Sequence, residues 1–406
     1  MSRALSRLRT RATVDEVPNP RTAEEPALVT STPAPADPES TSPLPPEVTV
    51  ATPGPAPAPR QRRTPGALLG HVTRTYSLPI LLVVSLLLYS LWDKTSGTFA
   101  TSANFQQIAS GRSVTGVLTL GILITLVSGN FDLSIGNICG LSSVMTAAAF
   151  SHWHFPLVLG LLFGVALGAA VGGMNGFLTT TLRVDPFIIT LGTAAIILGF
   201  VDWYTDGVSI INGIPQPVID FGRTKFLGIP EIAWVLAVVA LLIYYLLEHT
   251  PYGRSLHAIG SNRNAARLVG IRVERTITSA FALTGAFAGV AGVLLLAQTG
   301  SGNPTVGTTF TLEALASAFL GAVSFKVGRL NVPGTLVAIF FLQVNLTGLT
   351  YAGVQNWINQ VFTGLTLILA VALAAVLSKE RRTKASSTSG AAASPSGSTE
   401  ETRTPA

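Results

Sequence analysis

Charged side chains are scarce in this chain, since Asp, Glu, Lys and Arg together supply 11% of its 406 residues. Soluble globular domains carry roughly 25% charged residues, so the composition excludes an ordinary soluble domain. Cysteine is nearly absent as well, and the single Cys139 excludes a disulfide within the chain. A formal charge of +6 remains, but much of the excess lies beside apolar runs, where it orients spans and does not indicate a nucleic-acid partner.

Catalytic and cofactor motifs are missing too. The sequence has no Gly-x-x-x-x-Gly-Lys-Ser/Thr loop for phosphates, no Gly-x-Ser-x-Gly nucleophile elbow and no His/Cys/Asp/Glu cluster at metal-ligand spacing. His152 and His154 flank Trp153, which favours an anchor at a membrane interface over a pair of metal ligands. We therefore expect no enzyme, no cofactor and no metal, with any ATP hydrolysis left to a separate partner.

Apolar runs near twenty residues are what the sequence has in abundance, together with 39 glycines and a mean hydropathy of +0.51. Runs of this length cross a bilayer as helices. We predict an all-α polytopic membrane protein with about ten transmembrane helices, some of them broken, and with both termini cytoplasmic, since Lys and Arg beside spans stay inside. The predicted spans lie at residues 76–92, 113–128, 135–150, 156–181, 186–204, 231–247, 276–297, 312–325, 333–349 and 357–377.

Three parts are expected along the chain. Residues 1–75 form a disordered, Pro/Ala-rich cytoplasmic tail, residues 76–377 the transmembrane domain, and residues 378–406 a second disordered cytoplasmic tail. Residues 93–111 are predicted to be a polar connection on the outer side.

An arginine-rich loop at residues 250–275 separates two apolar runs. Within it, Ser261 or Asn262 can cap a short helix, and Gly270 suits the position just past the helix end. So short a helix is unstable alone in water and must dock against something. We expect it to dock on a separate ATPase; the alternative is a solvated loop that only fixes topology. The residues assigned to ATPase coupling are Arg254, Ser261, Asn262, Ala265, Ala266, Arg267 and Gly270.

Glycines recur every fourth residue in one predicted span. Spacing of four places them on one helix face, where another backbone can approach closely. Helix packing, in a dense bundle or at a subunit contact, is the favoured interpretation. The strip consists of Gly160, Gly164, Gly168 and Gly172.

Two polar, glycine-containing breaks interrupt the apolar pattern, at Gly129–Gly136 and at Gly321–Gly334. A break at membrane depth is tolerated only against protein or a wet cavity. Asp132 in the first break either caps the following helix or lines a transport route. The candidate pathway residues are Asn130, Asp132, Ser134, Asn175, Thr190 and Asn303.

Several ordered motifs over roughly residues 100–377 resemble the ribose/xylose-type sugar ABC permeases. GRSLHAIGSN (253–262) and AARLVGI (265–271) resemble that family's cytoplasmic coupling motif, and GNFDLSIG (129–136) resembles its Gly-Gly-x-Asp-Leu-Ser-x-Gly signature, with Asn130 at the second glycine. The second break departs further from the family pattern. PFIITLGT (186–193) and residues 345–364 also match. The resemblance implies that the 250–275 loop seats on a nucleotide-binding subunit.

The resulting hypothesis is the permease subunit of an ATP-binding-cassette importer, multi-pass in a bacterial inner (plasma) membrane, that carries a sugar or similar small polar solute. Its expected partners are a cytoplasmic ATP-binding subunit, an extracytoplasmic solute-binding protein and a second permease chain, as homodimer or heterodimer. An ion-coupled secondary transporter using Asp132 or Glu313 is the alternative. A membrane scaffold assembled through the glycine strip is a third hypothesis.

Overall fold

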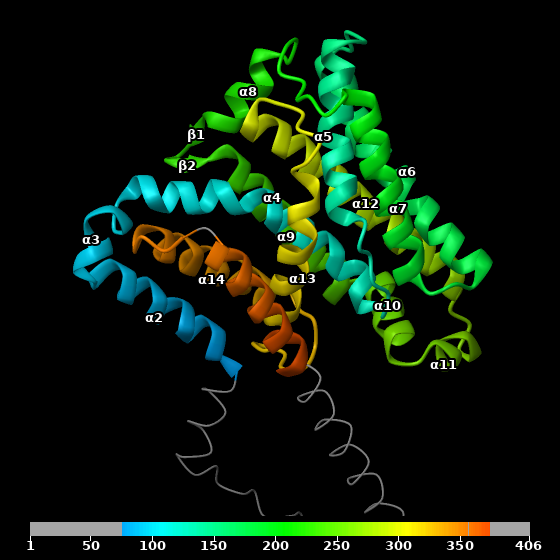
Figure 1. Ribbon diagram of the computed structural model, residues 1–406. Coiled ribbons are helices and arrows are strands. Elements are labelled where there is room, and N and C mark those ends of the chain that lie inside the picture. The colour runs from blue at the N-terminus through cyan, green and yellow to red at the C-terminus, as the bar shows by residue number, and fades with distance from the viewer. Residues whose placement is uncertain (1–74, 356, 374–406) are drawn as a thin grey trace, which may run out of the picture. The chain divides into compact units, whose positions relative to one another are not determined.

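The computed structural model of the protein describes residues 75–355 and 357–373 (Figure 1). The two tails predicted from the sequence lie outside these residues, apart from Thr75. The described part of the chain is almost entirely helical, as predicted. Its elements are α2 (Ser77–Leu91), α3 (Asp93–Phe99), α4 (Ser102–Val127), α5 (Ile135–Ser151), α6 (Leu157–Leu182), α7 (Pro186–Thr205), α8 (Gln216–Arg223), β1 (Lys225–Phe226), β2 (Ile229–Pro230), α9 (Glu231–His249), α10 (Pro251–Ser261), α11 (Arg263–Leu268), α12 (Val273–Thr299), α13 (Gly307–Gly321), α14 (Val332–Tyr351) and a last apolar helix, Trp357–Leu373.

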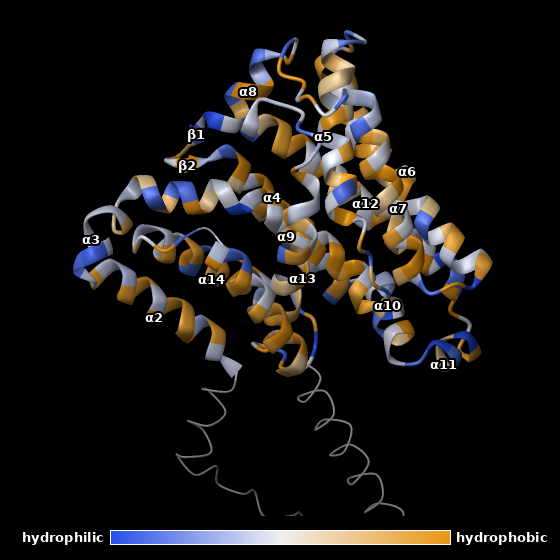
Figure 2. Cartoon of the chain, in the orientation of Figure 1, coloured by the Kyte–Doolittle hydropathy of each residue, from blue (hydrophilic) through white to orange (hydrophobic). Residues whose placement is uncertain are grey.

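Among the described residues, six helices are long and apolar enough to cross a membrane: α4, α6, α7, α9, α12 and α14. The count rises to seven if α2 and α3, bent by 99° at Trp92, form one span. Helix α5 and the helix Trp357–Leu373 are apolar but shorter. The all-α membrane class is therefore confirmed, with one small addition, since β1 and β2 pair as an antiparallel hairpin after α8. Hydrophobic residues dominate α6, α7 and α9, and hydrophilic ones gather in α8 and α11 (Figure 2).

The prediction of a polar connection at residues 93–111 is wrong. Residues 93–99 form helix α3, and α4 begins at Ser102, where the Thr101 side chain accepts a hydrogen bond from the amide of Asn104. The polar residues misled the assignment because they belong to the first turns of a 26-residue helix and not to a loop. As a result, the helix before the first break is 26 residues long, and Arg112, which follows the predicted connection, lies inside this helix.

Helices α4 and α12 occupy the interior of the helix bundle. Their most apolar segments are 78% and 67% buried, against 22% for α6 and 28% for α7. Helix α12 packs against α4, α5 and α6, and the main hydrophobic cluster draws on these helices (Figure 1). Helices α6 and α7 therefore lie at the periphery, where apolar side chains can face lipid.

The glycine strip of α6 lies at its contact with α12 and α5. A Cβ atom added at Gly168 would meet the Gly285 carbonyl, and one added at Gly172 would meet the Phe281 carbonyl, both on α12. Gly285 on α12 faces back onto the Gly168 carbonyl, so glycines from both helices bring the two backbones together. Towards the other end of the strip, Gly160 and Gly164 face side chains of α5.

Replacing Gly172 by alanine should destabilise the protein, because the new Cβ would lie 2.9 Å from Gly285 Cα as well as against the Phe281 carbonyl. Overpacking of this kind costs about 1–3 kcal/mol. The matched control is Gly192→Ala on α7, where no atom lies within 4 Å of an added Cβ. Alanine there should be neutral or stabilise by up to ~1 kcal/mol. Thermal unfolding in lipid nanodiscs, followed by tryptophan fluorescence, compares the two variants; equal shifts would contradict the packing role.

Candidate functional site

The segment 250–275 folds as two helices, α10 and α11, joined at Asn262. The first was missed in the sequence analysis, although its signals are present: Thr250 caps Gly253 N at 3.1 Å, and Pro251 occupies the first turn. Gly253, Leu256 and Ile259 are buried at a spacing of three, which gives α10 one inward face.

Helix α11 is the short helix expected at this position. Its N-cap is Asn262, whose Oδ1 accepts from the amides of Asn264 and Ala265 at 3.0 Å. Gly270 adopts φ +85° just past the helix, as predicted for a C-terminal glycine. Ala266 is buried in a hydrophobic cluster with Ile259, Val273, Ile277 and Phe281. This cluster is the dock that so short a helix requires.

The outward side of α11 is exposed and partly apolar. Leu268 is 89% exposed and Val269 75% exposed. Arg267 also lies at the surface and pairs with Glu274 of α12 at 2.6 Å. The remaining residues assigned to coupling, apart from the buried Ala266, are exposed: Arg254, Ser261, Asn262, Ala265 and Gly270.

The first break is attached directly to this helix pair. Arg263 Nη2 donates a 2.8 Å hydrogen bond to Asn130 Oδ1, and Gly260 of α10 packs against the Val127 carbonyl at the end of α4. Asn130 itself is 1% exposed. The left-handed residue here is Gly129 (φ +78°) and not Asn130, so asparagine replaces the family's second glycine without needing a positive φ.

A buried polar cluster holds the break to α6 and α7. Asp132 Oδ1 accepts from the Ser134 amide and hydroxyl at 2.9 and 2.6 Å. Asn175 Nδ2 donates to Ser134 Oγ at 2.9 Å, and Thr193 Oγ1 donates to Asn175 Oδ1 at 2.6 Å. Thr190 accepts from the Leu133 amide at 3.1 Å. Thr193 was not assigned to the site, although its i,i+3 relation to Thr190 already places both on one helix face.

The pathway residues predicted from the sequence thus separate into two groups. Five of them, Asn130, Asp132, Ser134, Asn175 and Thr190, lie together and are 0–1% exposed. Asn303 lies apart, in the α12–α13 connection, where it accepts from the Thr305 amide at 2.9 Å. Asp132 bonds to residue 134 in a local turn and not to the first-turn amides of α5, so the expected helix cap does not form. Its Oδ2 has no hydrogen-bond partner among the described residues.

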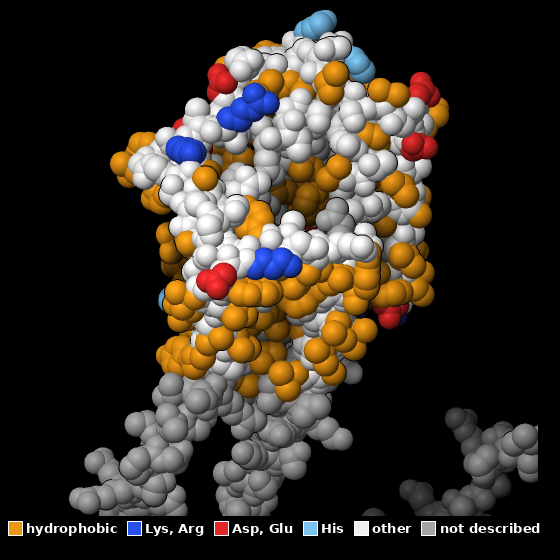
Figure 3. Space-filling model, turned by 60° about the vertical axis from the view of Figure 1, so that its left-hand side comes forward, with side chains coloured by type: hydrophobic (Ala, Val, Ile, Leu, Met, Phe, Trp, Pro, Cys, Tyr) orange, Lys and Arg blue, Asp and Glu red, His pale blue; other side chains and the backbone are white. Residues whose placement is uncertain are grey.

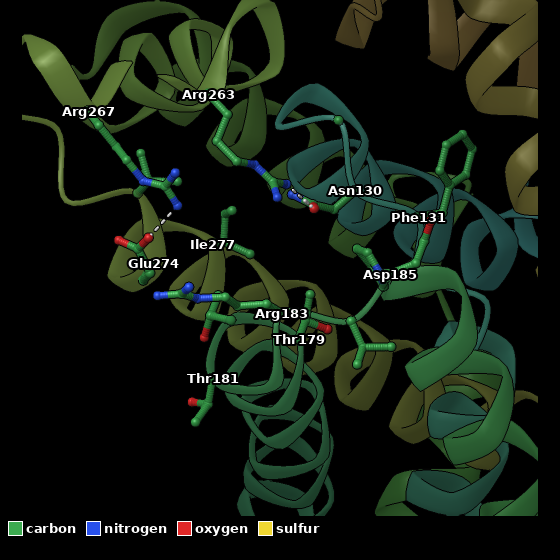
Figure 4. Close-up of a pocket in the computed structure, with 15 residues that line it drawn as sticks. Asn130, Phe131, Thr179, Thr181, Arg183, Asp185, Arg263, Arg267, Glu274 and Ile277 are labelled. Carbon is green, nitrogen blue, oxygen red and sulfur yellow. Dashed lines mark hydrogen bonds and ion pairs between the residues drawn. The ribbon is translucent and has the colours of Figure 1, made fainter. Parts of the chain in front are cut away.

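A cavity of about 780 Å³ lies between the first break, the end of α6, the start of α7 and helix α11 (Figure 4). Three guanidinium groups line it, from Arg183, Arg263 and Arg267, together with the carboxylates of Asp185 and Glu274. Asp185 caps α7 by accepting from the Phe187 amide at 2.9 Å. The cavity is therefore polar and large enough for a hydrated small molecule. Among the described residues, no group of His, Cys, Asp and Glu could hold a metal ion.

The second break is also tied to the coupling region. Lys326 pairs with Glu248 at the end of α9, at 2.5 Å, and His257 of α10 lies near both residues and near Arg329. Burial lowers the pKa of His257 most; Arg329 and Lys326 lower it further, and Glu248 opposes them. Because its pKa is lowered, His257 is mostly neutral at pH 7 and adds no further positive charge beside Lys326 and Arg329.

The structure combines a multi-pass helical bundle with a helix pair that is docked on its first break, and this is the architecture of a membrane permease. The chain belongs to the family described as branched-chain amino acid transport system / permease component, which matches residues 104–371. It is 30% identical to the ribose import permease protein RbsC of Escherichia coli K12 over 71% of this chain and 91% of that protein. It is 33% identical to the D-allose transport system permease protein AlsC of the same strain, over 69% and 86%.

A third relative is the galactose/methyl galactoside import permease protein MglC of Haemophilus influenzae, 31% identical over 68% of this chain and 87% of that protein. No solved structure matches the chain. The predicted membership of the ribose/xylose-type sugar ABC permeases is confirmed, and these relatives support the importer permease over the ion-coupled alternative.

Removing the Arg263 guanidinium should loosen the first break. Arg263→Ala takes from the buried Asn130 a hydrogen bond to a charged group, worth about 1.5–3 kcal/mol. Amide hydrogen exchange at residues 129–134 should then accelerate roughly tenfold or more. The control, Arg267→Ala, removes a half-exposed pair worth ~0–1 kcal/mol and leaves Asn130 bonded. Mass-spectrometric exchange on the purified chain measures both; equal protection in the two variants would contradict the link.

Proposed function

We propose that the chain is the membrane-spanning subunit of an ATP-binding-cassette importer for a sugar or a similar small polar solute, in a bacterial inner membrane. A separate cytoplasmic subunit hydrolyses ATP, and an extracytoplasmic solute-binding protein delivers the cargo. A second permease chain completes the pathway. Ribose, allose and galactose, which appear in the names of relatives, define the class of cargo to be tested first.

The observation that carries the proposal is the exposed apolar tip of a helix that is firmly held at its base. Leu268 and Val269 project from α11, whereas Ala266 and the Asn262 cap fix that helix against α10 and α12. An exposed leucine on a rigid helix is suited to a pocket on a partner protein. A loop that only set topology would need neither the cap nor the buried cluster.

The same contacts supply a route for force. A partner that moves α11 also pulls on the first break through Arg263 and Asn130, and α10 lies beside the Glu248–Lys326 pair of the second break. ATP can drive the permease only if the ATPase binds its two conformations with different affinity. The docked helix pair is where that difference acts.

The chain crosses the membrane ten times in this proposal, with both termini in the cytoplasm. Six crossings precede the coupling segment and four follow it, so the arginine-rich segment and the termini share one side. Helix α5, which is short, crosses by lying against other helices and not against lipid. The crossings are α2, α4, α5, α6, α7 and α9, then α12, α13, α14 and Trp357–Leu373.

A negative charge at the tip of α11 should break docking. Leu268→Glu is expected to weaken binding of the ATPase subunit by about 30-fold, the effect of losing a ~2 kcal/mol hot spot. Leu268→Met keeps an apolar side chain and serves as the control. Binding of the two purified subunits is measured by interferometry, and uptake of D-ribose by proteoliposomes of the whole complex is measured in parallel.

In the same vesicles, vanadate should abolish uptake by the unaltered complex, whereas an uncoupler should not. Full binding and transport by Leu268→Glu would refute docking through α11. Loss of uptake with the uncoupler while ATP is intact would point to an ion-coupled transporter instead.

A further inference from the structure

The peripheral helices present apolar side chains outwards. Lipid-facing surfaces of membrane helices should be apolar, because a polar group facing hydrocarbon loses its hydrogen bonds with water. Helices α2, α6, α7, α9 and Trp357–Leu373 meet this condition along most of their length. Examples are Leu87 (54% exposed), Val158 (66%), Ile196 (72%), Val238 (63%) and Ile368 (66%).

Helices α4, α13 and α14 differ from that pattern, as do the largely buried helices α5 and α12. Among their residues, only Phe105 and Leu312 are large hydrophobic side chains that are exposed, and α14 has none. Thr308 and Thr309 on α13 are exposed instead, and Arg112, Glu313 and Gln343 are each partly exposed. A face with this composition is unsuited to lipid.

The polar side chains of this face form one bonded group across three helices. Arg112 of α4 pairs with Glu313 of α13 through Nη1 and donates from Nε to Gln343 Oε1 of α14. Gln343 Nε2 in turn donates to Thr347 Oγ1 at 2.9 Å. We call Arg112, Glu313 and Gln343 the triad. Gln343 lies near the middle of α14, and Arg112 lies well inside α4, so the triad sits along membrane-crossing lengths of helix.

Charges at that depth are costly unless they meet a partner or water. The triad has the partner, and its side chains also keep a share of open surface: 13% for Arg112 and 27% for Glu313. The polar cluster around Asp132 differs in this respect, since its members are 0–6% exposed and bond to one another. The α4–α13–α14 face therefore keeps open polar surface that the Asp132 cluster lacks.

Figure 3 shows the side of the molecule that carries α2 and α3, and the centre of this side is hollowed. Hydrophobic atoms lie deep in the hollow. Around its rim most atoms belong to backbone or to side chains that are neither hydrophobic nor charged.

We propose that the α4–α13–α14 face is the wall of the translocation pathway, and that the triad contacts the hydroxyl groups of a polyhydroxylated solute in transit. The inference rests on the proposed function. A carboxylate accepts hydrogen bonds from hydroxyls, a guanidinium donates to them, and an amide does both, so the three groups match a ligand rich in alcohols. A pre-formed ion pair also holds these groups in place before the solute arrives.

Water access to the face can be tested without knowing the cargo. Cys139 is the only cysteine and is 0% exposed, so it stays in place as an unreactive background. Thr309→Cys on α13 and the control Val238→Cys on α9 both lie at exposed positions. The permease, in bilayer nanodiscs with its ATPase, is treated with a membrane-impermeant cationic methanethiosulfonate. We expect Thr309→Cys to react at least tenfold faster than Val238→Cys. Equal rates, or an unreactive Thr309→Cys, would show that the α4–α13–α14 face does not contact water and would refute its role as the pathway wall.

The triad's contact with solute is tested by D-ribose uptake into proteoliposomes of the whole complex. Glu313→Gln keeps the side-chain shape, and we expect it to raise KM at least tenfold with little change in the rate at saturation. The exchanged pair Arg112→Glu with Glu313→Arg restores an ion pair but misplaces both groups for the solute. Wild-type uptake by that double variant, or an unchanged KM in Glu313→Gln, would show that the triad only holds helices together and overturn the contact.

Failure of the proposed function would look different from failure of this inference. If the unaltered complex shows no ATP-dependent uptake of any sugar, the proposed function fails, and the cysteine reactivities still decide whether the face is wet. If the unaltered complex transports and Thr309→Cys stays unreactive, only the inference fails.

Discussion

The structure depends on one constraint, that backbone amides and carbonyls inside a membrane protein must find partners within the protein. At two interruptions of the helical ladder, residues 128–134 and 322–331, turn bonds within the backbone and bonds from side chains replace the missing helical bonds. At the first, Asp132 and Thr190 accept from backbone amides. At the second, Asn331 Oδ1 accepts from Gly334 N, and its Nδ2 donates to the Ser324 carbonyl. The first role of these polar groups is therefore structural, because they bond the backbone at the two breaks.

The two breaks interrupt the helical hydrogen bonds of an otherwise closely packed bundle. The glycine contact between α6 and α12 fixes two backbones face to face, and close packing of this kind shifts in steps and does not stretch. The breaks lie at the end where α10 and α11 attach, through Arg263 and Asn130 at one and near the Glu248–Lys326 pair at the other. Under the proposed function, a displacement of the helix pair would therefore reach both interruptions.

Sequence reasoning reached most of the fold because the signals were local. Apolar runs, the Asn262 cap, Gly270 after α11 and the four-residue glycine spacing each depend on neighbouring residues, and each corresponds to what the structure contains. It failed at residues 93–111, where polar residues occupy the first turns of α4, and at α10, whose burial pattern was hidden by its basic residues. The Arg263–Asn130 and Arg112–Glu313 contacts join residues far apart in the chain, so no single sequence reveals them.

The same limit explains why the burial of the proposed pathway residues could not be predicted from the sequence. A polar residue in an apolar run can either form hydrogen bonds within the protein or face water. The sequence looks the same in both cases. Only burial separates them. Ser134 and Asn175 are hydrogen-bonded to each other, and both are 0% exposed. The side chain of Glu313 is still 27% exposed, although it is paired with Arg112. A group that is paired and still partly exposed can bind a further partner, and under the proposed pathway the solute's route therefore follows residual exposure and not polarity.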